Sequence, residues 1–296
     1  MRNAKLLNYL HLHFIVFIWG FTAVLGALIS IDAIPLVWYR MFLATGFVLL
    51  IVLYKNESLV LPWKTIASFC FVGFLIALHW LAFFSAIKVS NVSVTLAVMS
   101  TGAFFASFLE PIMYRRKVKG YEVFFGLIVV ISLYIIFKVE SKYFLGILLA
   151  LASAFLGALF SVFNGKFVEK HSASVISFYE LLAGVFCISV FLFFRGSFTL
   201  SFFKLTSTDW FYLIILASFC TAYAFIASVH VMKWISPYTM MLTTNMEPVY
   251  GILLALIILG DKEYMSPQFY YGALIILITV IINGIIKTRI KKAEIH

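Results

Sequence analysis

Long runs of apolar residues, broken only by short polar connectors, constrain this chain more than any other feature. A helix of about 20 apolar residues crosses a bilayer core about 30 Å thick. Ten such runs follow one another, near residues 10–30, 36–54, 65–87, 93–113, 121–137, 144–163, 175–194, 210–232, 238–259 and 268–286. The sequence therefore predicts an all-α integral membrane protein with ten transmembrane helices, whose first partner is the lipid bilayer.

Composition supports this fold class. Of the 296 residues, 64% are hydrophobic and 11% are charged, whereas soluble domains are roughly 45–50% apolar and 25% charged. The mean hydropathy is +1.08. These values exclude a water-soluble globular enzyme and a nucleic-acid-binding chain. No polar stretch is long enough for a soluble domain, so we expect the membrane part to carry the function.

The positions of the basic residues predict an orientation. The net charge is +10, from 22 Lys and Arg against 12 Asp and Glu. If the N-terminus is cytoplasmic, 15 of the 22 cations lie on the cytoplasmic side and 6 on the other, and Arg40 lies inside the second run. Cytoplasmic loops carry an excess of Lys and Arg. The sequence therefore predicts a retained first helix and a multi-pass protein with both termini in the cytoplasm.

The order of the runs indicates an internal repeat. Five runs precede the short connector 138–143 and five follow it. An odd number of spans in each half places the second half in the membrane upside down, as in many transporters. Residues 1–138 and 139–296 are thus predicted to be two inverted five-helix repeats. Direct similarity is weak: an offset of 146 residues pairs Ser90 with Ser236 and few other positions.

Charged residues inside a membrane are costly and are functional candidates by default. Glu247 lies in the middle of the ninth run and shares a helix face with Thr243 and Gly251, four residues away on either side. Pro248 removes the hydrogen bond that would reach Thr244, so we expect a kink that Gly251 can assist. This face suits substrate binding or proton exchange; a structural carboxyl bonded to a neighbouring helix is the alternative.

Three further intramembrane charges leave alternatives open. Arg40 can extend its charged end to the outer interface or pair with a carboxyl of the protein. Alternatively, it binds a substrate carboxylate through two hydrogen bonds. Glu180 is expected to make a buried hydrogen bond, with substrate contact as the alternative. Glu110 is expected to form an ion pair with Arg115 or Arg116 of the basic loop at 115–119.

Aromatic and small residues at helical spacing mark further candidates. His79 lies deep in the third run and either contacts substrate or bonds a backbone carbonyl, and Trp80 beside it can stack on a ligand. Trp19 lies on a similar stripe of the first run. Small residues at 153, 157 and 161 of the sixth run indicate close helix packing, with a polar path as the weaker alternative.

Motifs of several enzyme classes do not occur. The sequence contains neither GxxxxGK[ST] nor HExxH nor GxSxG. The three cysteines lie singly in apolar runs, which predicts no metal site and no cofactor. Transport would then be passive or coupled to an ion gradient, for which protons are the simplest candidate.

The motifs together resemble the EamA-type ten-helix members of the drug/metabolite transporter superfamily. The first run carries Trp19-Gly20, and the second carries Arg40 after a proline. The closing half reads Glu247-Pro248-Val249-Tyr250-Gly251, then Leu259-Gly260-Asp261, then Gln268 and Gly272. The sequence departs from the family pattern in three places: Gly102 stands where a proline is usual, 115–117 are basic where an acid is usual, and Asp261 replaces Glu.

The resemblance implies two inverted five-helix repeats around a central cavity lined by helices 1, 3, 4, 6, 8 and 9. It adds Tyr223 to the cavity candidates, which become Trp19, His79, Trp80, Tyr223, Thr244 and Glu247. It also implies export of amino acids or other small metabolites across the bacterial inner membrane.

The predicted function is therefore a secondary-active or facilitative transporter, not an enzyme. It would export a small polar metabolite such as an amino acid by alternating access. The alternative hypothesis is an integral membrane enzyme acting on a lipid-linked substrate, which would need acids or metal ligands clustered at one interface. The substrate, the coupling ion, the direction of transport and homo-oligomer formation stay open.

Overall fold

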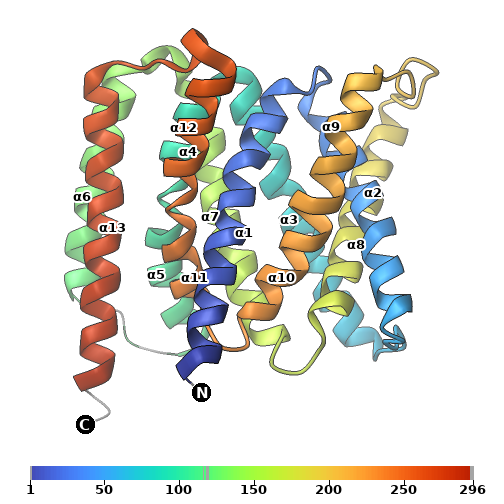
Figure 1. The fold of residues 1–296 in the computed structure, drawn as a ribbon, viewed down its shortest axis with the longest axis horizontal. Coiled ribbons are helices and arrows are strands. Elements are labelled where there is room, and N and C mark those ends of the chain that lie inside the picture. Colours follow the sequence, from blue (N-terminus) through green and yellow to red (C-terminus); the bar gives the residue numbers. More distant parts are fainter. Residues whose placement is uncertain (1, 116, 118–119, 294–296) are drawn as a thin grey trace.

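The protein is a bundle of helices that run roughly parallel to one another (Figure 1). The computed structural model describes residues 2–115, 117 and 120–293, and no strand occurs among them. Up to residue 139 the helices are α1 (Arg2–Leu28), α2 (Ala33–Tyr54), α3 (Trp63–Val89), α4 (Val92–Met99), α5 (Gly102–Met113) and α6 (Gly120–Val139). They continue as α7 (Phe144–Phe167), α8 (Ala173–Phe194), α9 (Ser207–Ala217), α10 (Ala224–Val231), α11 (Pro237–Thr244), α12 (Glu247–Leu259) and α13 (Pro267–Ala293).

All ten predicted runs fall on helices, and eight helical segments are long and apolar enough to cross a membrane. Three of the eight are composite: α4 with α5, α9 with α10, and α11 with α12. The two remaining runs lie on α6 and α13, whose described apolar stretches, Phe124–Ile136 and Pro267–Asn283, are shorter. These two helices pack against each other at one edge of the bundle (Figure 1).

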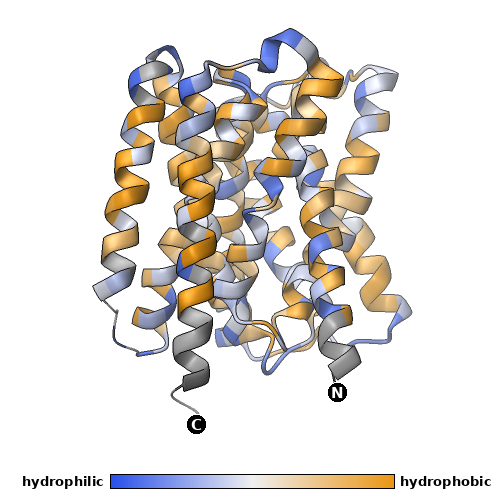
Figure 2. Ribbon diagram, turned by 60° about the vertical axis from the view of Figure 1, so that its left-hand side comes forward, coloured by the Kyte–Doolittle hydropathy of each residue, from blue (hydrophilic) through white to orange (hydrophobic). Residues whose placement is uncertain are grey.

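The surface of the bundle is apolar where a membrane would surround it. Phe186, Phe193 and Ile257 are 67–79% exposed in the middle and ends of long helices. Figure 2 shows that hydrophobic residues cover the outer helices along much of their length and that hydrophilic residues gather at the two ends. Side chains such as these are stable against lipid tails, and each helix satisfies its own backbone hydrogen bonds there.

The two ends of the bundle can be told apart by the chain termini. Helix α1 begins and α13 ends at the same end of the bundle (Figure 1); we call this end the termini face and the other the opposite face. The basic loop predicted to lie at the termini face is described only in part, because residues 116, 118 and 119 lie outside the described residues.

Two composite helices have matching architecture. Asn91 caps α4 by accepting a hydrogen bond from Val94 N (2.8 Å), and Ser236 caps α11 by accepting one from Thr239 N (3.3 Å). Each capped helix is eight residues long and is followed by a two-residue interruption, at 100–101 and at 245–246. Helices α4 and α11 therefore have the same length and the same kind of N-terminal cap, although their sequences differ.

The second interruption follows from the local sequence. Pro248 has no backbone N–H to donate to the carbonyl of Thr244. The chain tightens instead, and Met246 N donates to Thr243 O at 3.0 Å. The predicted kink at Pro248 is therefore observed as a break immediately before Glu247, which becomes the first residue of α12.

A π-helical turn that no sequence pattern indicated joins α9 to α10. It spans Ser218–Tyr223, and the hydroxyl of Thr221 donates to the carbonyl of Leu216, five residues back, at 2.6 Å. Single π-turns inside α-helices are rare and often occur at functional sites. This turn directs Thr221 toward the second helix of the bundle.

Candidate central substrate cavity

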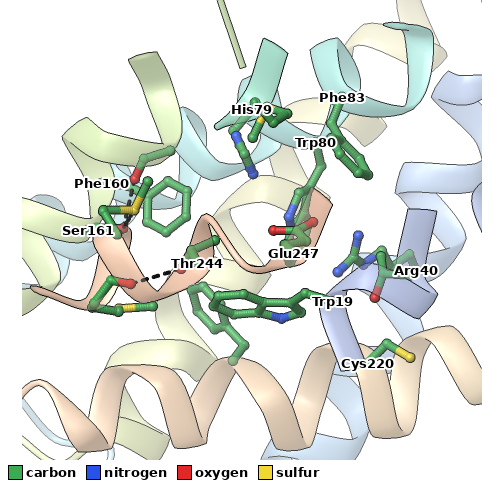
Figure 3. Close-up of a pocket in the computed structure, with 16 residues that line it drawn as sticks. Trp19, Arg40, His79, Trp80, Phe83, Phe160, Ser161, Cys220, Thr244 and Glu247 are labelled. Carbon is green, nitrogen blue, oxygen red and sulfur yellow. Dashed lines mark hydrogen bonds between the residues drawn. The ribbon is translucent and has the colours of Figure 1, made fainter. Parts of the chain in front are cut away.

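A cavity of about 80 Å³ lies among the helices that the resemblance predicted, with α2 in addition. Its wall combines aromatic residues with one arginine, one histidine and one carboxyl (Figure 3). The lining residues are Trp19, Thr22, Arg40, His79, Trp80, Phe83, Met99, Gly157, Phe160, Ser161, Cys220, Phe225, Met240, Met241, Thr244 and Glu247.

Arg40 is buried in the wall of this cavity, with 2% of its surface exposed. Its Nε donates to Thr221 Oγ1 at 2.7 Å, and its guanidinium lies over the ring of Trp80 at 4.0 Å from the ring centre. Of the alternatives left open for Arg40, snorkelling to the interface is therefore wrong: a hydroxyl and an aromatic face hold the side chain inside the bundle. The two terminal nitrogens of Arg40 make no hydrogen bond to any described residue.

Glu247 faces Arg40 in the wall of the cavity and is 8% exposed (Figure 3). Its carboxyl makes no hydrogen bond and no salt bridge within the described part of the chain. It stands in the first turn of α12, where the helix dipole favours a negative charge. Helix α11 ends at Thr244 beside it, and α4 ends at Met99 in the same wall, so the ends of both interrupted helices meet the cavity.

His79 is fixed by contacts with α7. Its Nδ1 lies 2.8 Å from the carbonyl oxygen of Ser153 and 2.9 Å from the hydroxyl of the same residue. If Nδ1–H donates to the carbonyl, Nε2 is left as an acceptor, and the ring points into the cavity (Figure 3). Gly157 faces the ring, and a Cβ there would lie 3.2 Å from Cε1 of His79. The small residues of α7 at 153 and 157 thus allow the ring of His79 to lie close to the α7 backbone.

Comparison with known proteins agrees with this geometry. A model of the EamA-like transporter family matches residues 8–138 and residues 144–285, which together are most of the chain. The chain belongs to the EamA-like transporter family. It is therefore a membrane transporter of the drug/metabolite type, and its long apolar helices agree with a multi-pass membrane protein.

The fold of this EamA-like chain also occurs among solved structures. One, titled only "Crystal structure of protein", is 16% identical, covers 92% of this chain and 95% of its own, and has a TM-score of 0.67. This likeness shows the shared fold alone. No curated protein matches the chain.

Most of the predicted site residues of this transporter lie together. Trp19, Arg40, His79, Trp80, Thr244 and Glu247 all line the cavity. Tyr223 does not: it lines a separate cavity of about 380 Å³, and its hydroxyl lies 2.9 Å from Nε2 of His11. Tyr223 and Cys220 both lie in the π-turn, and of the two only Cys220 lines the central cavity.

Two further predicted residues, Thr243 and Gly251, do not line the cavity. The hydroxyl of Thr243 donates to Thr239 O at 3.0 Å, and the break after Thr244 ends the face that Thr243 was predicted to share with Glu247. Gly251 lies inside the continuous helix α12, where a Cβ would lie 3.1 Å from Gly20 O. Gly251 therefore allows α12 to approach α1 closely, and the bend lies at 245–246.

The two other acidic candidates make structural contacts. Asn164 Nδ2 donates to Glu180 Oε2 at 3.2 Å, which confirms the predicted buried hydrogen bond. Glu110 accepts a hydrogen bond from Tyr238 N at 3.0 Å. The predicted ion pair of Glu110 with Arg115 or Arg116 stays a prediction, because Arg116 lies outside the described residues.

The residues that sequence analysis missed are mainly uncharged. Thr221 positions Arg40, and Phe83, Phe160 and Phe225 supply apolar wall. Isolated Thr and Phe residues are common in transmembrane helices, so no local signal separates these from packing residues. One signal was available: in the eighth run Ser218, Thr221, Phe225 and Ser228 recur at helical spacing, and two of these four residues line or support the cavity.

Proposed function

We propose that this transporter moves a small zwitterionic metabolite such as an amino acid, by alternating access about the central cavity. The observation that carries the proposal is the pairing of opposite charges in one cavity without a bond between them. Arg40 and Glu247 are both more than nine-tenths buried. A buried charge needs a partner to offset its lost hydration, and a zwitterion supplies one to each residue.

Arg40 suits the carboxylate end of such a substrate. Its Nε is occupied by Thr221, which leaves the two terminal nitrogens as a planar fork. This fork can donate two parallel hydrogen bonds to a carboxylate. The ring of Trp80 lies against one face of the guanidinium and restricts its rotation, so less freedom is lost when substrate binds.

Glu247 suits the ammonium end. Its carboxylate can accept charge-assisted hydrogen bonds from an ammonium group. Protonation of the same carboxyl would release the ammonium group. Glu247 is therefore also our candidate for proton coupling.

The size of the cavity limits the substrate. About 80 Å³ holds a handful of water molecules at about 10–15 Å³ each, and therefore a molecule with few heavy atoms. Phe83, Phe160 and Phe225 would contact the side chain of an amino acid. We further propose two inverted repeats, 1–138 and 139–296, with export from the cytoplasm across the inner membrane as the direction.

A transport assay in proteoliposomes tests the proposal. We expect uptake of radiolabelled alanine, and no comparable uptake of ethylamine or propionate, which each lack one of the two charges. E247Q should lose alanine transport, and R40K should raise the KM because lysine retains charge but not the bidentate fork. The matched control is E169Q, which changes an exposed glutamate.

Two results would contradict the proposal. If E247Q transports alanine at the wild-type rate and with the wild-type pH dependence, Glu247 has no role in binding or coupling. If ethylamine or propionate crosses as fast as alanine, the cavity does not require both charges.

A further inference from the structure

Two buried carboxyls link the interrupted helices at opposite ends of the bundle. At the opposite face, Glu263 follows α12 in a short 3₁₀ turn, Gly260–Glu263, and is 2% exposed. Its Oε1 accepts from Val92 N at 3.1 Å, and its Oε2 accepts from Ser93 N at 2.8 Å. The hydroxyl of Ser93 lies 2.9 Å from the same Oε2. The end of α12 therefore caps the beginning of α4.

The termini face repeats this arrangement with the roles of the two helices exchanged. Glu110 lies near the end of α5 and is 4% exposed. Its Oε2 accepts from Tyr238 N at 3.0 Å, in the first turn of α11. The preceding residue, Pro237, has no N–H to satisfy. The end of the α4–α5 helix therefore caps the beginning of the α11–α12 helix.

The donors of the two contacts are equivalent in position, whereas Glu110 lies inside α5 and Glu263 follows α12. In each helix the second residue, Ser93 or Tyr238, donates its N–H to a carboxyl of the other composite helix. The third residue donates to the side chain of the capping residue, Asn91 or Ser236. Helix α4 packs against α12 and α5 packs against α11, so the two composite helices lie side by side along both of their segments.

We propose that Glu263 and Glu110 are positioning residues for transport: each holds the cavity closed toward its own face of the membrane, and the two release in alternation. This proposal rests on the alternating access of the proposed function. Both helices reach the central cavity at their interruptions, through Met99 and Thr244. Opening the cavity to one face requires α4 and α12, or α5 and α11, to separate at that face.

Carboxylates suit this role because the contact is strong and local. A carboxylate accepts charge-assisted hydrogen bonds from backbone N–H groups, and the positive end of the helix dipole adds to the attraction. Glutamine retains the size and one acceptor oxygen but loses the charge and the second acceptor. E263Q and E110Q should therefore weaken one contact each while leaving the surrounding packing in place.

The native Cys220 reports which face is open. It lines the cavity and is 1% exposed, so it reacts with a reagent only when the cavity opens. The other two cysteines, Cys70 and Cys187, are half-buried and are replaced by alanine in the test background. The measured quantity is the rate at which a membrane-impermeant maleimide, added from one face only, labels Cys220 in oriented vesicles.

We expect E263Q to increase the labelling rate from the opposite face several-fold and to decrease it from the termini face. E110Q should produce the reverse, and the double variant should return toward the wild-type ratio because both contacts are weakened. S93A removes a single hydroxyl from the Glu263 contact and should act in the same direction as E263Q, but less. E169Q is the matched control and should leave both rates unchanged.

Labelling of E263Q and E110Q at wild-type rates from both faces, with unchanged melting temperatures, overturns the proposal. So does an increase from the same face in both variants. The labelling assay contains no substrate, so it separates the two proposals. Rates that shift as expected in vesicles that do not transport alanine support the two caps and contradict the proposed substrate.

Discussion

At the scale of single residues, the cavity depends on how Arg40 is held. Its guanidinium has one protein hydrogen bond, to Thr221, and one aromatic neighbour, Trp80. Thr221 in turn donates to Leu216 O through the π-turn. A substitution at Thr221 or Trp80 should therefore alter substrate binding, although it leaves the charged residues Arg40 and Glu247 in place.

Replacing Thr221 with valine tests this positioning. T221V keeps the shape of the side chain but removes the acceptor for Arg40 Nε. Leaving a buried donor without an acceptor lowers the free energy of unfolding by about 1–3 kcal/mol. We expect a raised KM for alanine and a lower melting temperature. The matched control is T45V, because Thr45 is buried and its hydroxyl bonds only its own helix, at Met41 O. Equal KM values in T221V and the wild type would show that Trp80 alone positions Arg40.

The buried pair of Asn164 and Glu180 provides a second test. Glu180 is fully buried, and its Oε1 and the Oδ1 of Asn164 have no hydrogen-bond partner among the described atoms. A glutamine at 180 can accept from Asn164 Nδ2 and donate to its Oδ1, and it carries no charge. We expect E180Q to retain or raise the melting temperature and E180A to lower stability by about 1–3 kcal/mol. Strong destabilisation by E180Q, measured by thermal unfolding in detergent, would show that a negative charge is required there.

At the scale of helices, close backbone approach holds the bundle together. Helix α3 packs against both α7 and α8. At Gly73 an added Cβ would lie only 2.2 Å from Glu180 O, which belongs to the backbone of α8 and cannot turn away. Small residues at such crossings allow van der Waals packing, which drives helix association in lipid.

Alanine substitution at two glycines tests this packing. G73A forces α3 and α8 apart, and overpacking of this kind costs about 1–3 kcal/mol or more. G46A is the matched control, because an added Cβ in α2 meets nothing within 4 Å. It should leave stability unchanged or raise it by about 0.5–1 kcal/mol, since alanine favours helices. The comparison is made by the melting temperature and the yield of folded protein; equal values for the two variants would contradict the packing argument.

At the scale of the whole molecule, both ends of the chain lie at one face of the bundle (Figure 1). With the cation distribution, this predicts that the termini face is cytoplasmic. Single cysteines at the start of α1 and the end of α13 should be protected from an impermeant thiol reagent in intact cells. A cysteine in the loop 196–204 should react. Labelling of a terminal cysteine from outside would reverse the orientation and the proposed direction of export.

The ten apolar runs, the kink at Pro248 and the intramembrane charges could be predicted from sequence because each rests on local chemistry, and the family resemblance added the cavity to which six of the predicted residues belong. The hydrophobicity of a run, the missing N–H of a proline and the cost of an intramembrane charge do not depend on distant residues. The prediction that Tyr223 lines the cavity was wrong because no local pattern indicates the π-turn, Ser218–Tyr223. A π-turn adds a residue to one turn of helix, so the side chains at its end point in a different direction than in a regular helix.

The sequence by itself determined that the chain is a membrane protein and that a few charges would be buried in it, since insertion into lipid depends on the composition of each helix. Only the tertiary structure decided which of those charges meet. Arg40 bonds Thr221 across 181 residues, and Glu263 caps Ser93 across 170. Such contacts depend on which helices pack together and at what rotation, and small residues such as Gly73 determine that packing only when the whole bundle is assembled.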